Sequence, residues 1–270
     1  MSEPADPPAV DEAVQRRRMT VALVLIAILA AISVVVVGAV AGAGSGSAGA
    51  TGGGPEASGS ASATPRPAPA TVPPPASVDT FDRTAHSLDD PASIWVVVNQ
   101  VRPLNPQDYV PDDLVEVPVA HSWVPEMRQE ASDAVVAMFA AAADEADFYL
   151  ASNSAYRSYD TQVELYGDGS DPTTAPPGHS EHQTGLAMDI GTEGGCTFEC
   201  MDDSAEGEWV RANAWRFGFI LRYPADKVDI TGYPHESWHF RYVGVPLATE
   251  MHEKGITTLE EFFGVPGGGA

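Results

Sequence analysis

The chain has 270 residues, with 14 Lys and Arg against 38 Asp and Glu, which gives a formal net charge of −24. So few basic side chains cannot neutralise a phosphate backbone. The composition therefore argues against nucleic acid as a partner and against docking on an anionic membrane surface. The length allows one or two domains. Because the first third has no core-forming sequence, we expect one folded domain.

The N-terminal segment predicts export. Arg16, Arg17 and Arg18 precede an uncharged apolar run over residues 19–43, and about 20 such residues span a bilayer as a helix. The positive-inside rule places residues 1–18 in the cytoplasm as a tail and the rest of the chain outside. The alternative is a signal peptide cleaved near Ala39-Val40-Ala41, which would release a secreted protein. The length of the run favours a single-pass membrane protein with a retained signal anchor.

A linker and then a folded domain follow the anchor. Residues 44–90 are rich in Gly, Ser and Pro and cannot bury enough apolar surface to offset the entropy of ordering. We expect a disordered tether there and a domain over residues 91–265.

The pattern within the domain predicts helices first and then short strands. A buried apolar run over 94–98 reads as a strand, and Pro125 is expected to open a helix with an apolar face. Ser204 is a plausible helix N-cap and Gly218 a stop signal. Strands are expected over 219–223 and 238–243, and helices over 160–166, 246–254 and 259–263. This order predicts an α+β domain, with a small antiparallel sheet and flanking helices.

The two cysteines, Cys196 and Cys200, are four residues apart. In an oxidising compartment they could form a local disulfide, which we favour over two free thiols. The pair offers too few ligands for a metal site of its own.

The segment Ser180–Asp189 contains a histidine, His182, seven residues before Asp189. Residues an odd number apart in a strand face opposite sides. A single straight strand could therefore not aim both side chains at one metal ion. Gly185 offers a break. We expect His182 on a loop or strand end and Asp189 on a strand over 186–190.

A second segment, Glu236-Ser237-Trp238-His239, follows about fifty residues later. The aromatic residues of the following strand alternate with His239, so packing them on the core turns His239 towards the site. Glu236 is expected on the preceding turn. Together the two segments supply three protein ligands for Zn²⁺ (His182, Asp189 and His239), an open water position, and Glu236 as general base. This ligand set suits one zinc ion without excluding other divalent ions.

The pattern Ser-x-His-x-x-Gly-x-Ala-x-Asp followed by Glu-x-x-His resembles the VanY-type zinc D-alanyl-D-alanine carboxypeptidases, relatives of VanX and of the hedgehog-like zinc peptidase fold. Residues 155–162, 215–219 and 238–244 agree with it. The resemblance implies that Arg157 binds the free C-terminal carboxylate of the substrate, that Ser180 lines the substrate site and that Gln162 helps to shape it. The implied substrate is the peptidoglycan stem peptide, cut before its terminal D-alanine by a monomeric enzyme.

Several alternatives stay open at this point. An L,D-carboxypeptidase or a D,D-dipeptidase would use the same chemistry, and a non-catalytic module that binds wall peptides is a rival of another class. Glu181 and Asp160 are expected in solvent, and Arg241 is expected to pair with a nearby acid. His179 and His235 fall outside the motif positions.

Overall fold

The computed structural model describes residues 80–171 and 174–268, which belong to one compact unit. The predicted tail, the anchor over 19–43 and the linker up to residue 79 lie outside the described residues. Within the described ranges, every helix is too short or too polar to cross a membrane.

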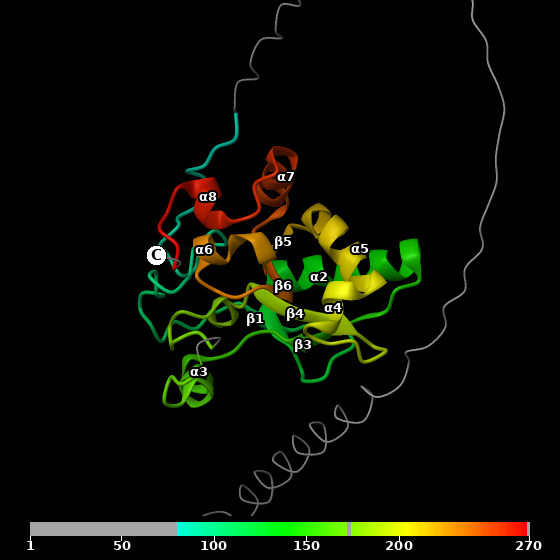
Figure 1. Ribbon diagram of the computed structural model, residues 1–270, viewed down its shortest axis with the longest axis horizontal. Helices are drawn as coiled ribbons and strands as arrows, with labels where there is room; N and C mark the ends of the chain where they lie inside the picture. Colours follow the sequence, from blue (N-terminus) through cyan, green and yellow to red (C-terminus); the bar gives the residue numbers. More distant parts are fainter. Residues whose placement is uncertain (1–79, 172–173, 269–270) are drawn as a thin grey trace, which may run out of the picture. The chain divides into compact units, whose positions relative to one another are not determined.

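The unit consists of short strands and helices (Figure 1). In chain order they are β1 (Leu114–Glu116), β2 (Glu126–Arg128), α2 (Gln129–Ala146), β3 (Leu150–Ser154), α3 (Tyr159–Tyr166), a 3₁₀ turn (Glu181–Thr184), β4 (Ala187–Thr192), α4 (Cys200–Asp203), α5 (Ala205–Asn213), a 3₁₀ turn (Ala214–Phe217), β5 (Phe219–Tyr223), a 3₁₀ turn (Ala225–Lys227), α6 (Val228–Thr231), β6 (Glu236–Tyr242), α7 (Val245–Lys254) and α8 (Leu259–Phe263).

The main sheet has the strand order β3-β4-β6-β5, with every neighbouring pair antiparallel. β1 and β2 form a separate antiparallel pair. The α+β class and the antiparallel sheet with flanking helices are therefore confirmed.

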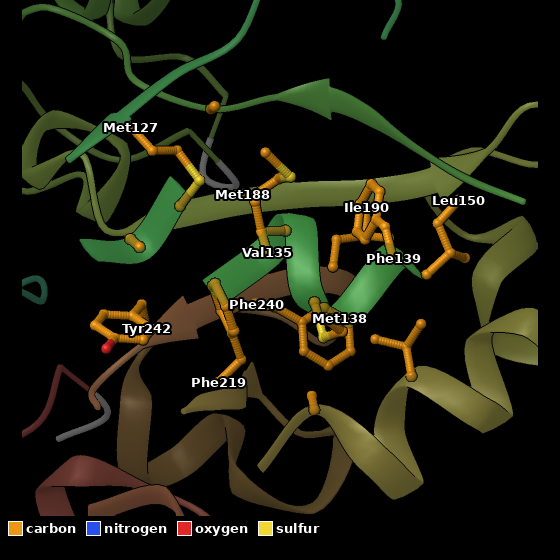
Figure 2. Close-up of a cluster of buried hydrophobic side chains, with 14 of the residues drawn as sticks. Met127, Val135, Met138, Phe139, Leu150, Met188, Ile190, Phe219, Phe240 and Tyr242 are labelled. Atoms are coloured by element: carbon orange, nitrogen blue, oxygen red, sulfur yellow. The ribbon is translucent and has the colours of Figure 1, made fainter. Parts of the chain in front are cut away.

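One face of the sheet packs against α2 and forms the main core (Figure 2). The helix contributes Val135 and Met138, and the two central strands contribute Met188 and Phe240, which lie opposite each other in the register. All four side chains are fully buried. Because side chains alternate along a strand, the residue after Met188 on β4 and the residue before Phe240 on β6 face away from this core. Those residues build the site described below.

Residues 94–98 do not form a strand, so the prediction of a strand there was wrong. Trp95, Val96, Val97 and Val98 are indeed buried, but side chains satisfy many of their backbone groups. Arg241 Nη2 donates to the carbonyls of Ile94 and Val96 at 3.0 and 2.9 Å. A buried carbonyl needs a partner of some kind, and here an arginine takes the place of a neighbouring strand.

Two further boundaries differ from expectation. The segment after Pro125 first pairs as β2 with β1, so the helix begins at Gln129. Residues 81–90, which the sequence assigned to the linker, pack against the rest of this unit. Phe81 stacks on Trp95 with ring centroids 5.7 Å apart, and Leu88 accepts a hydrogen bond from the backbone N–H of Val97.

The remaining element predictions agree closely with the structure. Ser204 caps α5 by accepting a hydrogen bond from the N–H of Gly207, and Gly218 ends the following 3₁₀ turn in the left-handed region. The expected strand over 219–223 is β5, and the expected helices over 160–166, 246–254 and 259–263 are α3, α7 and α8.

Candidate active site and metal centre

His182, Asp189 and His239 come together on the face of the sheet opposite α2. One ligand atom from each residue lies within 4.8 Å of the others. His182 Nε2 and His239 Nδ1 lie 3.4 and 3.2 Å from Asp189 Oδ1. All three side chains are buried.

The backbone explains how residues at an odd spacing converge. His182 lies in the 3₁₀ turn Glu181–Thr184, which ends at Gly185 with φ of +67°. This left-handed conformation suits glycine. A Cβ at Gly185 would lie 2.8 Å from a methyl of Leu114. Asp189 follows on β4, directly opposite His239 on β6. The break expected at Gly185 is therefore present.

The donor set fits a divalent cation. His182 Nδ1 lies 2.7 Å from the carbonyl of Ala155, and donating its proton there leaves Nε2 free to bind a metal ion. Asp189 Oδ1 and His239 Nδ1 are buried without a hydrogen-bond partner. Buried polar atoms in that condition call for an explanation such as an ion.

The charges around the cluster favour a cation as well. Burial opposes ionisation of Asp189, but the His182 and His239 imidazoles outweigh it and hold the pKa of the carboxyl well below its usual range. Burial lowers the pKa of His182. Burial also acts to lower the pKa of His239, but the neighbouring carboxylates of Asp189 and Glu181 raise it to about 9. The carboxylates around the cluster therefore stabilise a positive charge beside His239.

Glu236 points at the same place from the first residue of β6. It was expected on the preceding turn, from which it could face the site despite its odd spacing from His239. In the structure Glu236 belongs to β6 itself, and it faces the site because the β5–β6 pairing shifts register between Leu221 and Tyr223. Glu236 Oε2 lies 3.5 Å from His239 Nδ1. Burial raises the pKa of Glu236 to about 7, a value suited to general acid–base work near neutral pH.

Arg157, Gln162 and Ser180 also come together. Arg157 Nε donates to Gln162 Oε1 at 2.6 Å, and its Nη2 donates to Ser180 Oγ at 3.3 Å. Gln162 is held in turn by the carbonyl of Ala175. Arg157 and Ser180 line a cavity of about 150 Å³ together with the His/Asp/His cluster and Glu236. The guanidinium of Arg157 and the candidate metal site therefore line the same cavity.

Sequence reasoning missed a buried ion network behind the cluster. Glu181 was expected in solvent, but only 1% of its surface is exposed. Its Oε1 accepts from Arg222 Nε at 2.8 Å and from Arg241 Nη1 at 2.7 Å. Burial opposes ionisation of Glu181, yet Arg222 and Arg241 hold its pKa well below the usual range. Arg241 pairs with an acid as expected.

A signal for this network was present in the sequence. Arg222 and Arg241 each occupy a predicted strand, and 14 basic residues stand against 38 acidic ones. An arginine buried by the sheet would therefore find a carboxylate, but the sequence could not show which one.

The other candidates outside the motif are not part of the cluster. Cys196 and Cys200 form a disulfide, the favoured alternative. His179 Nδ1 contacts the carbonyl of Asn99, and His235 bridges the carbonyl of Tyr223 and Asp202. Asp160 is exposed, as expected.

Two imidazoles, one carboxylate and a neighbouring glutamate around a cavity define a zinc peptidase site. Comparisons with known proteins agree with this class. The family described as "VanY: D-alanyl-D-alanine carboxypeptidase" matches residues 125–245. The YodJ protein of Bacillus subtilis is 42% identical over 192 residues, which are 66% of this chain and 69% of the relative. A D-alanyl-D-alanine carboxypeptidase of Enterococcus faecium is 44% identical over 110 residues, which are 41% of this chain and 35% of the relative.

Solved structures of peptidases are also similar to this chain. The LdcB LD-carboxypeptidase is 42% identical with a TM-score of 0.59, and the alignment covers 64% of this chain and 87% of that one. VanYB in complex with D-alanine-D-alanine is 32% identical with a TM-score of 0.51, over 63% of this chain and 96% of that one. A vancomycin-resistance D,D-pentapeptidase VanY in complex with Zn(II) is 32% identical with a TM-score of 0.50, over 62% of this chain and 97% of that one.

The chain belongs to the VanY family of D-alanyl-D-alanine carboxypeptidases. It is a metallopeptidase, and the chemistry of its His/Asp/His cluster together with the Zn(II)-containing relative makes zinc its cofactor.

Proposed function

We propose that the protein removes the C-terminal D-alanine from peptidoglycan stem peptides by zinc-dependent hydrolysis. The observation that carries this proposal is the guanidinium of Arg157 in the same cavity as the His/Asp/His cluster and Glu236. A planar guanidinium binds a carboxylate through paired hydrogen bonds. An anion-binding group next to a hydrolytic centre selects a substrate whose reacting bond lies close to a free carboxylate, as it does in a carboxypeptidase.

The metal ligands in this proposal are His182 Nε2, Asp189 Oδ1 and His239 Nδ1. Zinc bound there supplies the Lewis acidity that polarises the scissile carbonyl and acidifies the attacking water. The protein's own share is to hold these atoms in place. The carbonyl of Ala155 orients His182, and the opposed positions of Asp189 and His239 in the β4–β6 register fix the other two ligands.

Glu236 acts as the general base and then as the general acid. Its carboxylate takes the proton of the attacking water and later delivers it to the amine of the departing D-alanine. Its pKa of about 7, raised by burial, allows the same carboxyl to accept and to release a proton near neutral pH.

Substrate orientation comes from the other end of the cavity. Gln162 and Ser180 engage Nε and Nη2 of Arg157, so the guanidinium plane is fixed before the substrate binds. Fixing a binding group in advance reduces the entropy lost when the substrate is ordered. Arg157 thereby places the terminal residue and presents the preceding peptide bond to the ligand cluster.

The location of the enzyme is part of the proposal. The apolar run after Arg16–Arg18 would anchor a monomeric enzyme in the cell membrane as a single-pass protein. The linker would then carry the catalytic domain to the wall outside the cytoplasm. If the run is cleaved as a signal peptide, the same domain is secreted.

An L,D-carboxypeptidase is the second candidate, because the LdcB LD-carboxypeptidase is 42% identical to this chain. One assay separates the alternatives. The zinc-loaded protein is incubated in turn with stem pentapeptide, stem tetrapeptide and free D-alanyl-D-alanine, and released alanine is measured. Release from the pentapeptide supports the D,D-carboxypeptidase. Release only from the tetrapeptide would replace it with the L,D-enzyme, and cleavage of the dipeptide alone would make the protein a dipeptidase.

A further inference from the structure

Glu181 contacts the candidate zinc site from behind, although it is not one of the cluster residues. It precedes His182 in the 3₁₀ turn, and its two carboxylate oxygens have different partners. Oε1 accepts from Arg222 and Arg241, while Oε2 lies 3.4 Å from His239 Nε2. The carboxylate therefore lies between two guanidiniums and one imidazole.

The two ring nitrogens of His239 have different neighbours. Nδ1 faces Asp189 Oδ1 and Glu236 Oε2, so Nδ1 is the ligand atom. A neutral imidazole that offers the lone pair of Nδ1 carries its proton on Nε2. That proton needs an acceptor in a buried place, and Glu181 Oε2 supplies it. His182 has the opposite arrangement, because its Nδ1 faces the carbonyl of Ala155.

Glu181 is itself fixed from several sides. Arg222 also pairs with Glu260 of α8 through Nη1 at 2.9 Å and Nη2 at 2.7 Å, and Asn99 donates to the same carboxylate. These two glutamates and the two arginines balance in charge, and each is at most 3% exposed. The network joins the centre of the sheet to α8, which lies beyond the segment that the family matches.

We propose that Glu181 is a positioning residue of the zinc site: it accepts the Nε2–H of His239 and thereby fixes the tautomer and the orientation of that ligand. Arg222 and Arg241 both donate to Glu181 Oε1, which leaves Oε2 for the imidazole. The inference rests on His239 as a ligand in the proposed function. Partners of this kind, which orient a metal-bound histidine, typically contribute 10- to 100-fold to metal affinity.

The variant Glu181→Gln tests this with a clear chemical expectation. Arg222 and Arg241 are both donors, so the side-chain carbonyl of the glutamine must face them. Its NH₂ group then faces His239 Nε2 and requires a lone pair there. The proton of the imidazole moves to Nδ1, the ligand atom, and zinc binding is opposed.

The matched control is Glu260→Gln. It removes one carboxylate charge from the same network and from the same partner, Arg222, without touching His239. Zinc affinity of the full chain is measured by competition with a fluorescent chelator, and thermal unfolding is followed in parallel. We expect both variants to unfold at lower temperature than the parent. Glu181→Gln should lose about 10- to 100-fold in zinc affinity, and Glu260→Gln should stay within about threefold of the parent.

A measurement on the unmodified chain keeps the test valid if a variant does not fold. Long-range ¹H–¹⁵N correlations of the zinc-loaded protein identify the protonated nitrogen of each ring. We expect the proton on Nε2 in His239 and on Nδ1 in His182. A proton on Nδ1 of His239, an unchanged zinc affinity in Glu181→Gln, or an equal loss in Glu260→Gln would each overturn the proposal. None of these readings uses a peptide, so a wrong substrate assignment would leave the result intact.

Discussion

Replacing Glu236 by Gln separates catalysis from zinc binding and from folding. The two side chains have the same shape, but the amide cannot take a proton from water. A general base typically contributes 10²- to 10⁴-fold to the rate, which corresponds to about 2.7–5.5 kcal/mol of activation free energy. We therefore expect kcat for release of D-alanine from the stem pentapeptide to fall by that factor.

The structure also predicts what this change does to stability. Burial raises the pKa of Glu236 to about 7, so the ionised form is less favourable in the folded protein than in the unfolded chain. The contribution of this carboxyl to stability is present below its unfolded pKa and is lost as the pH rises through the folded value. A neutral glutamine avoids that loss. In chelator-treated protein at pH 8, Glu236→Gln should unfold at a temperature no lower than that of the parent.

The assay compares the parent, Glu236→Gln and Glu164→Gln. Glu164 lies exposed on α3, next to Leu165, which borders the cavity, so Glu164→Gln makes the same chemical change near the site. Zinc content is measured for each protein. If zinc-loaded Glu236→Gln keeps more than a tenth of the parental kcat, Glu236 is not the base. If Glu164→Gln loses as much activity as Glu236→Gln, the loss is not specific to the site.

Three further outcomes are expected. Arg157→Lys should lower kcat/KM for the pentapeptide by about 10- to 100-fold, because a charge-assisted hydrogen bond is worth about 1.5–3 kcal/mol; unchanged kinetics with normal zinc content would remove Arg157 from carboxylate binding. Stripping zinc with a chelator should abolish hydrolysis and lower the unfolding temperature, and added zinc should restore both; hydrolysis that survives complete removal of zinc contradicts the mechanism. Phe240→Ala should cost about 3–5 kcal/mol of unfolding free energy in urea, since Phe240 is fully buried against α2; a loss below 1 kcal/mol would mean that the core collapses around the cavity.

Much of the candidate site could be predicted because its constraints are local. The odd spacing between His182 and Asp189 required a break, and Gly185 supplies it with a positive φ. The alternation on β6 required His239 to face away from Phe240, and the register confirms it. Both arguments use only the geometry of a strand and the freedom of a glycine.

Predictions failed where a partner came from a distant part of the chain. The apolar run over 94–98 resembles a strand, but Arg241 takes up two of its carbonyls. Glu236 reached the site through an irregular β5–β6 pairing, and pairing irregularities leave no trace in local composition.

The sequence by itself determined the His/Asp/His set, the glutamate beside it and the α+β class, because motif spacing and side-chain period are properties of a short segment. Only the tertiary structure decided that Glu181 is buried behind His239, between arginines from β5 and β6, with Glu260 of α8 completing the network. The physical reason is that a charge can be buried only where opposite charges converge on it. The fold brings those charges together from segments up to 79 residues from Glu181 in the sequence.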